Sequence, residues 1–152
     1  MDTGDSVELC LGAIAESYPP QCSGITLEGW SWEGVEGSES SGDVTWGAYA
    51  VTGEYDGSSF KITQRPIMLA LYDPLMPPDP TNGKEGTSAE SDLTTIQEEL
   101  PSKLGAELLA AYTDRGYLWA HVVWDDGTLQ DAADAEYGEG VVIVESALRA
   151  LD

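Results

Sequence analysis

Residues 117–144 read YLWAHVVWDDGTLQDAADAEYGEGVVIV, and this stretch decides the fold of the second half of the chain. Its two apolar runs, 117–124 and 141–144, have the aromatic and β-branched composition of buried strands. Between them, Thr128 followed by Asp131 resembles a helix start, and an apolar stripe runs on to Tyr137 before Gly138. A strand, a short helical crossover and a second strand predict two strands paired in parallel, with helices on one face of the sheet.

The residues before this stretch have helical spacing. Leu93, Ile96 and Leu100 lie on one helical face, and Ser91 or Asp92 is the expected N-cap. Pro101 either starts a new helix or kinks the first one. A second apolar face is predicted to continue the helical structure up to Gly116, formed by Leu104, Leu108, Ala111 and Tyr112. We therefore predict an αβαβ unit over residues 93–152.

Residues 1–72 have the pattern of a β-rich half. Apolar or alternating segments at 7–13, 25–32, 45–55 and 65–72 predict strands. Asp56-Gly57 is a strong turn signal, and a four-residue loop there places Glu54 opposite Lys61 in a hairpin. The expected fold class is α+β, with a small barrel or half-sandwich packed with the C-terminal αβαβ unit.

Two polar stretches interrupt these elements. Residues 33–43 are rich in glycine, serine and acid and predict a loop. Residues 73–92 hold four prolines and two glycines in their first part and predict an acidic loop or linker. The linker separates the halves 1–72 and 93–152, which we expect to form one compact domain overall.

The charge of the chain excludes several functions. Its 28 aspartates and glutamates against 6 lysines and arginines give a formal net charge of -22. Such a surface disfavours nucleic acid, direct binding to anionic membranes and capture of acidic substrates. It permits a cationic protein or glycan as partner, divalent cations, or a salt-adapted surface that needs no partner.

Cys10 and Cys22 are the only cysteines, and the Tyr18-Pro19-Pro20 segment lies between them. A disulfide at this spacing closes a small loop and contributes roughly 3 kcal/mol in the chain-entropy model. Two unpaired buried thiols are the alternative. A zinc site is not expected, because a single histidine cannot complete the four ligands at any usual spacing.

Three segments resemble a known group of proteins. The first comprises residues 9–13, 16–22 and 29–30, the second residues 46–57, and the third residues 137–142 and 146–148. The most specific part is Tyr18-Pro19-Pro20-Gln21-Cys22, in the first segment. The pattern resembles that of uncharacterised secreted or lipid-anchored proteins of high-GC Gram-positive bacteria. The resemblance implies an extracytoplasmic domain with a Cys10–Cys22 bridge. It implies no chemistry.

Catalytic chemistry has little support. His121 is the only histidine, so a nucleophilic triad would need it together with Asp125 or Asp126, which lie past the strand end. A purely structural role in the strand explains His121 as well, either at the surface or with its hydrogen bonds satisfied. Paired carboxylates of a cell-envelope hydrolase are an alternative, but acids are too abundant for any pair to stand out. No glycine-rich nucleotide-binding motif is present.

A calcium site is a further alternative, in residues 125–136 or elsewhere on the acidic surface. Hard cations prefer several carboxylates on a tight turn. The EF-hand spacing fails, because Gly127 and Leu129 occupy positions where ligands belong. A turn followed by a helix that starts with acids explains the same residues. No other cofactor is expected.

Trp30, Trp32 and Trp46 flank the acidic loop 33–43. Tryptophans beside a polar loop suit either a contact surface or the core of a small β-domain, and Trp30 and Trp32 are predicted to share one strand face. We favour a non-catalytic extracytoplasmic binding module that uses these tryptophans as its contact surface. An envelope hydrolase and a structural envelope component with a salt-adapted surface are the alternatives.

Overall fold

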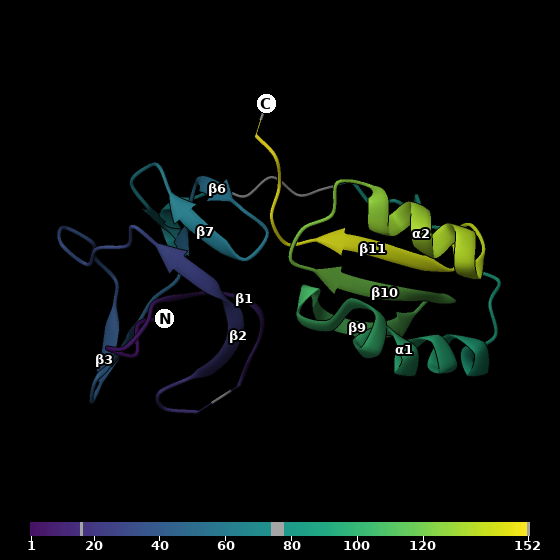
Figure 1. Cartoon of the computed structure of the whole chain (residues 1–152), viewed down its shortest axis with the longest axis horizontal. Helices are drawn as coiled ribbons and strands as arrows, with labels where there is room; N and C mark the ends of the chain where they lie inside the picture. Colours follow the sequence, from purple (N-terminus) through teal and green to yellow (C-terminus); the bar gives the residue numbers. More distant parts are fainter. Residues whose placement is uncertain (16, 74–77, 152) are drawn as a thin grey trace. The chain divides into compact units, whose positions relative to one another are not determined.

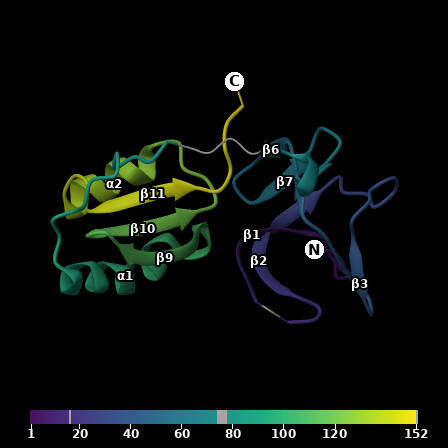
Figure 2. The same ribbon diagram turned by 180° about the vertical axis from the view of Figure 1, so that it is seen from behind.

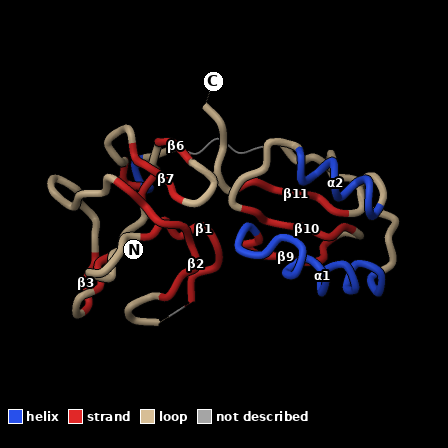
Figure 3. Tube along the Cα trace, viewed as in Figure 1, coloured by secondary structure: helices blue, strands red, loops and turns tan. Residues whose placement is uncertain are grey.

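The computed structural model describes residues 1–15, 17–73 and 78–151. The chain divides into two compact units, Met1–Met76 and Pro77–Asp152. Both α-helices belong to the second unit, whereas the first consists of strands, turns and one short 3-10 helix (Figure 3). The predicted α+β class is confirmed. Among the described residues, no helix combines the length and the apolar character needed to cross a membrane.

The main sheet of the first unit has four strands in the order β1-β2-β7-β6 (Figure 1). Strands β1 and β2 form one antiparallel hairpin, β6 and β7 form another, and β2 pairs with β7 in parallel. The bounds are β1 Glu8–Ala15, β2 Gln21–Glu28, β6 Gly53–Tyr55 and β7 Ser59–Ile62.

Two short ladders accompany this sheet. One pairs β3 (Glu39–Ser41) with β4 (Val44–Trp46), and the other pairs β5 (Tyr49–Ala50) with β8 (Ile67–Met68). The first residues of the chain lie between the β1–β2 hairpin and β3 (Figures 1 and 2), and Asp2 bridges to both Val7 and Thr45. Of the two predicted alternatives, a small barrel or a half-sandwich, the barrel is wrong, because the described strands form no closed barrel and the short ladders do not extend the four-stranded sheet around to its own edge.

The hairpin at Asp56-Gly57 is confirmed. Glu54 lies opposite Lys61, as the four-residue loop required. The Asp56 carboxylate accepts the backbone N–H groups of Ser58 and Ser59 at 2.9 and 2.8 Å, which closes the turn.

Three other predictions for this unit are corrected. The strand expected over 25–32 ends at Glu28, because Gly29 takes a φ of 79° that a strand cannot continue. The strand expected over 45–55 divides among β4, β5 and β6, and the loop expected over 33–43 contains β3.

The apolar run 65–72 is not a buried strand. It contains only the two residues of β8 and a 3-10 helix, η1 (Leu69–Leu71). Ile67, Leu69 and Leu71 are 46%, 47% and 77% exposed. These three side chains are therefore partly or largely exposed and do not form a core.

The second unit is a three-stranded sheet of order β11-β10-β9 with two helices (Figures 1 and 2). Strands β10 and β11 pair in parallel, with Leu118 opposite Val142, which confirms the predicted crossover. The bounds are α1 Glu90–Leu104, β9 Leu108–Asp114, β10 Tyr117–Val122, α2 Thr128–Tyr137 and β11 Val142–Ser146.

The order of this unit is αββαβ and not αβαβ. Helix α1 ends at Gly105, which has a φ of 56°, and a 3-10 turn, η2 (Gly105–Glu107), leads into β9. Strand β9 pairs antiparallel with β10, so Ala111 lies opposite Ala120 and Tyr112 opposite Trp119. The apolar spacing of this segment fits both a helix and a strand, and pairing with β10 decides for the strand. Gly116 belongs to the β9–β10 turn and does not end a helix.

Both helices cover the same face of the sheet, as predicted. Leu93, Ile96 and Leu100 of α1 pack on Leu118, Ala120 and Val142, and residues of α2 pack against the same cluster. The opposite face carries Tyr117, Trp119 and Ile143, which are also buried.

The predicted linker 73–92 is described only in part, because residues 74–77 lie outside the described residues. Asp79 accepts the backbone N–H of Thr81 at 2.9 Å and of Gly83 at 3.2 Å, which forms a turn. The Gly86 N–H donates to the Arg115 carbonyl at 2.7 Å. Helix α1 begins at Glu90 with Ala89 as N-cap, so neither Ser91 nor Asp92 caps it.

Candidate functional site

The first unit contains an apolar pocket of about 270 Å³. Its walls include all three tryptophans that the sequence singled out. The lining includes Trp30, Trp32, Trp46, Tyr49, Leu69 and the Cys10–Cys22 pair. Four aromatic side chains and a disulfide therefore line the pocket.

Local backbone structure brings these side chains together. Trp30 and Trp32 follow the end of β2, past the turn at Gly29, so they do not share a strand face as predicted. Trp46 is the last residue of β4, and Tyr49 is the first of β5. The pocket thus depends on the break between β4 and β5, which no periodic pattern in the sequence indicates.

Three of the rings form a packed cluster. The ring centroids of Trp30 and Trp32 are 5.0 Å apart at an interplanar angle of 78°, and those of Trp30 and Tyr49 are 5.2 Å apart. The Trp32 and Tyr49 centroids are separated by 6.2 Å. Edge-to-face packing at these distances is favourable and holds the rings in defined orientations.

Trp46 has a different aromatic partner. Its ring lies edge-on to that of Tyr18, with centroids 5.3 Å apart, and Tyr18 is 72% exposed. Trp46 therefore joins the pocket to an aromatic side chain at the surface.

Two of the three polar atoms of the ring cluster are engaged. The Trp32 indole N–H donates to the Asp2 carboxylate at 2.9 Å, and the Tyr49 hydroxyl donates to the Glu36 carbonyl at 2.6 Å. Hydrogen bonds from the Gly4 backbone and from Trp32 lower the pKa of Asp2. The Trp30 N–H is buried without a partner.

The disulfide that borders the pocket joins neighbouring strands. Cys10 and Cys22 have Cα atoms 5.7 Å apart, within the usual range for a disulfide. The bond is the outcome that the resemblance implied, and it is compatible with an extracytoplasmic protein.

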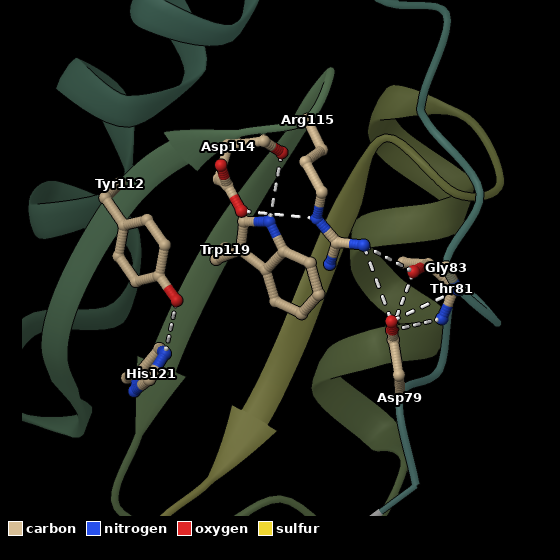
Figure 4. Close-up of polar contacts among 8 residues, drawn as sticks. All are labelled: Asp79, Thr81, Gly83, Tyr112, Asp114, Arg115, Trp119 and His121. Carbon is tan, nitrogen blue, oxygen red and sulfur yellow. Dashed lines mark hydrogen bonds and ion pairs between the residues drawn. The ribbon is translucent and has the colours of Figure 1, made fainter.

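His121 lies on the other unit and is not part of a triad. Strand register places it opposite Glu145, and its Nε2 is 2.9 Å from the Glu145 carboxylate and 3.3 Å from the Tyr112 hydroxyl. Figure 4 shows the Tyr112 hydroxyl directed at the His121 ring. The structure therefore pairs His121 with Glu145 and not with Asp125 or Asp126.

Asp125 and Asp126 instead form the start of α2. The Asp125 carboxylate accepts the N–H groups of Leu129 and Gln130 at 2.9 and 3.3 Å. Asp126 accepts the hydroxyl and the N–H of Thr128, and these bonds lower its pKa. Their side chains therefore accept the backbone N–H groups at the start of α2. This is the arrangement expected of a turn followed by a helix, the alternative to a calcium site. In the described part of the chain, no three or more His, Cys, Asp or Glu side chains are grouped so as to hold a metal ion.

Trp119, on the same face as His121, has a structural environment. The Arg115 guanidinium lies over its ring at 5.4 Å, and its indole N–H donates to the Asp114 carbonyl at 3.1 Å (Figure 4). Arg115 also contacts Asp79, which fixes the 79–83 turn next to Trp119. Trp119 is only 5% exposed and offers little surface to a ligand.

General acid chemistry finds no support in the shifted carboxyl groups. The pKa values of Asp2, Asp56, Asp79 and Asp126 are all lowered, mainly by hydrogen bonds that the carboxylates accept. A general acid at neutral pH needs a raised pKa.

Comparisons of the chain with protein-family models, with curated proteins and with solved structures found no match.

Proposed function

We propose that the protein is a non-catalytic extracytoplasmic binding module and that the tryptophan pocket is its contact site. The observation that carries the proposal is the meeting of Trp30, Trp32, Trp46 and Tyr49 around one pocket of about 270 Å³. Protein interiors are packed without voids of this size, so an open aromatic pocket is unusual for a purely structural core. Aromatic pockets with few polar groups are typical of ligand sites.

The surface charge supports a cationic partner. With a net charge of -22, the chain attracts positively charged proteins or glycans and repels nucleic acid and anionic membranes. In this proposal the acidic surface accelerates encounter, and the aromatic pocket supplies the contact area that sets the lifetime of the complex.

An extracytoplasmic location is supported by the Cys10–Cys22 disulfide, because such bonds persist in oxidising compartments. The resemblance of the Tyr-Pro-Pro-Gln-Cys segment to secreted or lipid-anchored proteins points the same way. The disulfide joins the two strands that border the pocket, so oxidation and binding are linked in the proposal.

A capture experiment tests the function. The oxidised protein is immobilised and exposed to native envelope and secreted extract at low salt, and bound material is eluted at high salt. We expect one enriched cationic protein or glycan that is retained by wild type and lost with Trp30→Ala or Trp46→Ala. Trp124→Ala, which removes a tryptophan of the other unit, is the matched control and should retain the partner.

Two results would contradict the proposal. Retention that is unaffected by both pocket variants would place binding elsewhere on the acidic surface. An empty elution, together with stability that rises as salt is added, would favour a structural component whose charge serves only solubility. Circular dichroism of each variant verifies that it is folded.

A further inference from the structure

The pocket geometry points to a specific ligand class: we infer that it binds an alkylated ammonium group, such as the trimethylammonium end of a small molecule or of a modified side chain. The inference rests on the proposed function and names the ligand of that same site. Three features carry it, namely the aromatic walls, the charges around them and the state of the polar atoms.

The aromatic walls favour a cation. The face of an aromatic ring carries partial negative charge, and tryptophan gives the strongest cation–π attraction. Four aromatic residues line this pocket: Trp30, Trp32, Trp46 and Tyr49. These four belong to two separate groups, because Trp30, Trp32 and Tyr49 pack together and Trp46 packs on Tyr18.

The charged side chains next to the walls are acidic. The Asp2 carboxylate accepts the Trp32 indole N–H at 2.9 Å, which draws the indole proton toward an anion and increases the electron density of the ring. Glu8 is the one charged side chain among the lining residues, which include no lysine, arginine or histidine. Met1 lines the pocket too, and its ammonium donates to the Glu8 carbonyl at 2.6 Å.

The engaged polar atoms favour a cation without N–H groups. The Trp32 N–H and the Tyr49 hydroxyl already have acceptors, whereas the Trp30 N–H is buried without one. Trp32 and Tyr49 therefore offer no free donor to an anion or to a neutral polar ligand. A primary ammonium or a guanidinium needs an acceptor for each of its N–H groups, and the indole rings supply none, whereas an alkylated ammonium has little or no hydrogen bonding to lose.

The size of the pocket agrees with a small group. Its volume of about 270 Å³ lies just below the range of roughly 300–1,000 Å³ that is typical of whole small-molecule ligands. The pocket can therefore take a headgroup, with the rest of the ligand outside.

The test compares choline with 3,3-dimethylbutan-1-ol, which has the same shape and no charge. Each is titrated into the oxidised protein at constant ionic strength, and binding is followed by the indole N–H resonances in NMR spectra. We expect choline to bind at least about tenfold more tightly than the alcohol. The indole resonances of Trp30, Trp32 and Trp46 should shift, and those of Trp119 and Trp124 should not.

Asp2→Asn provides the matched variant. It keeps an oxygen that can accept the Trp32 N–H and removes the negative charge, so choline affinity should fall several-fold while affinity for the alcohol stays the same. Asp5→Asn makes the same charge change at an exposed position outside the pocket lining and should leave both affinities within about twofold.

Equal affinity for choline and the alcohol would overturn the inference while leaving the pocket as a binding site. No choline binding, combined with a partner captured through the pocket tryptophans, would overturn the inference alone. No choline binding together with an empty capture would overturn both the inference and the proposed function.

Discussion

The side-chain amide of Gln130, on α2, pairs with the outer edge of β11: its Oε1 accepts the Val144 N–H at 2.9 Å. Its Nε2 donates to the Val142 carbonyl at 2.8 Å, so one glutamine makes the two bonds that a neighbouring strand would make. On the opposite edge of the sheet, Gln97 of α1 donates to the Ala111 carbonyl at 2.8 Å. Exposed strand edges invite pairing with other chains, and here glutamines from the two helices occupy part of each edge.

Replacing Gln130 should destabilise the second unit. Gln130→Ala removes both bonds to β11, and we expect a loss of about 1–3 kcal/mol in the free energy of unfolding, measured by urea denaturation. Gln97→Ala removes one bond and should cost about half as much. Equal stability of wild type and Gln130→Ala would show that water replaces the side chain without penalty.

The disulfide should stabilise the first unit. Reduction, or Cys10→Ser combined with Cys22→Ser, releases a loop closed over a sequence separation of 12 and should lower the free energy of unfolding by about 3 kcal/mol. Denaturation with and without a reducing agent measures this difference. The double-serine variant is the control, because a reducing agent should leave its unfolding midpoint unchanged. An unchanged midpoint for the wild type on reduction would contradict the prediction.

The sequence predicted the elements that depend on local or strongly periodic signals. The Asp56-Gly57 hairpin followed from its turn residues, and the parallel pairing of β10 with β11 followed from two apolar runs around a short helix. Strand β9 was missed because its apolar spacing satisfies a helix as well as a strand. Only its pairing with β10, a tertiary contact, settles the choice.

The sequence identified three residues of the candidate site but not how they are arranged in space. Trp30, Trp32 and Trp46 were identified from their position beside the acidic loop, and all three line the pocket. Tyr49 and Asp2 were not identified as site residues. The pocket forms through the β4–β5 break and the bridge from Asp2 to Thr45, and long-range contacts of this kind leave no periodic trace in the sequence.

The Asp56 turn should make stability depend on acid. Hydrogen bonds from Ser59 and Ser58 lower the pKa of Asp56 to about 2 from its ordinary value of 3.8. Because folding favours the ionised form, this stabilisation is complete above the ordinary pKa and is lost as the pH falls through about 2.

Asp56→Asn isolates this contribution. Asparagine followed by glycine still favours the turn, but it does not titrate, so the variant should lose less stability than wild type between about pH 4 and about pH 2. Urea denaturation at several pH values measures the difference, and NMR titration of the Asp56 carboxyl should give a midpoint of about 2. Parallel pH profiles for the two proteins would contradict the assignment.

Arg115 should hold the 79–83 turn against the sheet of the second unit. Its guanidinium is 3.4 Å from the Asp79 carboxylate and lies over the Trp119 ring (Figure 4), while Thr81 is 7% exposed. The ion pair is partly open to solvent, so the cation–π contact with Trp119 is the part that salt screens least.

Arg115→Asn removes the guanidinium contacts and keeps a residue that tolerates the backbone conformation at this position. Arg115 has a φ of 52°, a conformation that asparagine tolerates, so the β9–β10 turn should persist while the guanidinium contacts are lost. We expect faster hydrogen exchange at the Thr81 and Gly83 amides, which donate to Asp79, because the turn is no longer fixed to the sheet. Arg65→Asn removes the same charge from the first unit and should leave these amides unchanged. If exchange at Thr81 and Gly83 is the same in Arg115→Asn and wild type, Asp79 alone maintains the turn and Arg115 serves only to cover Trp119.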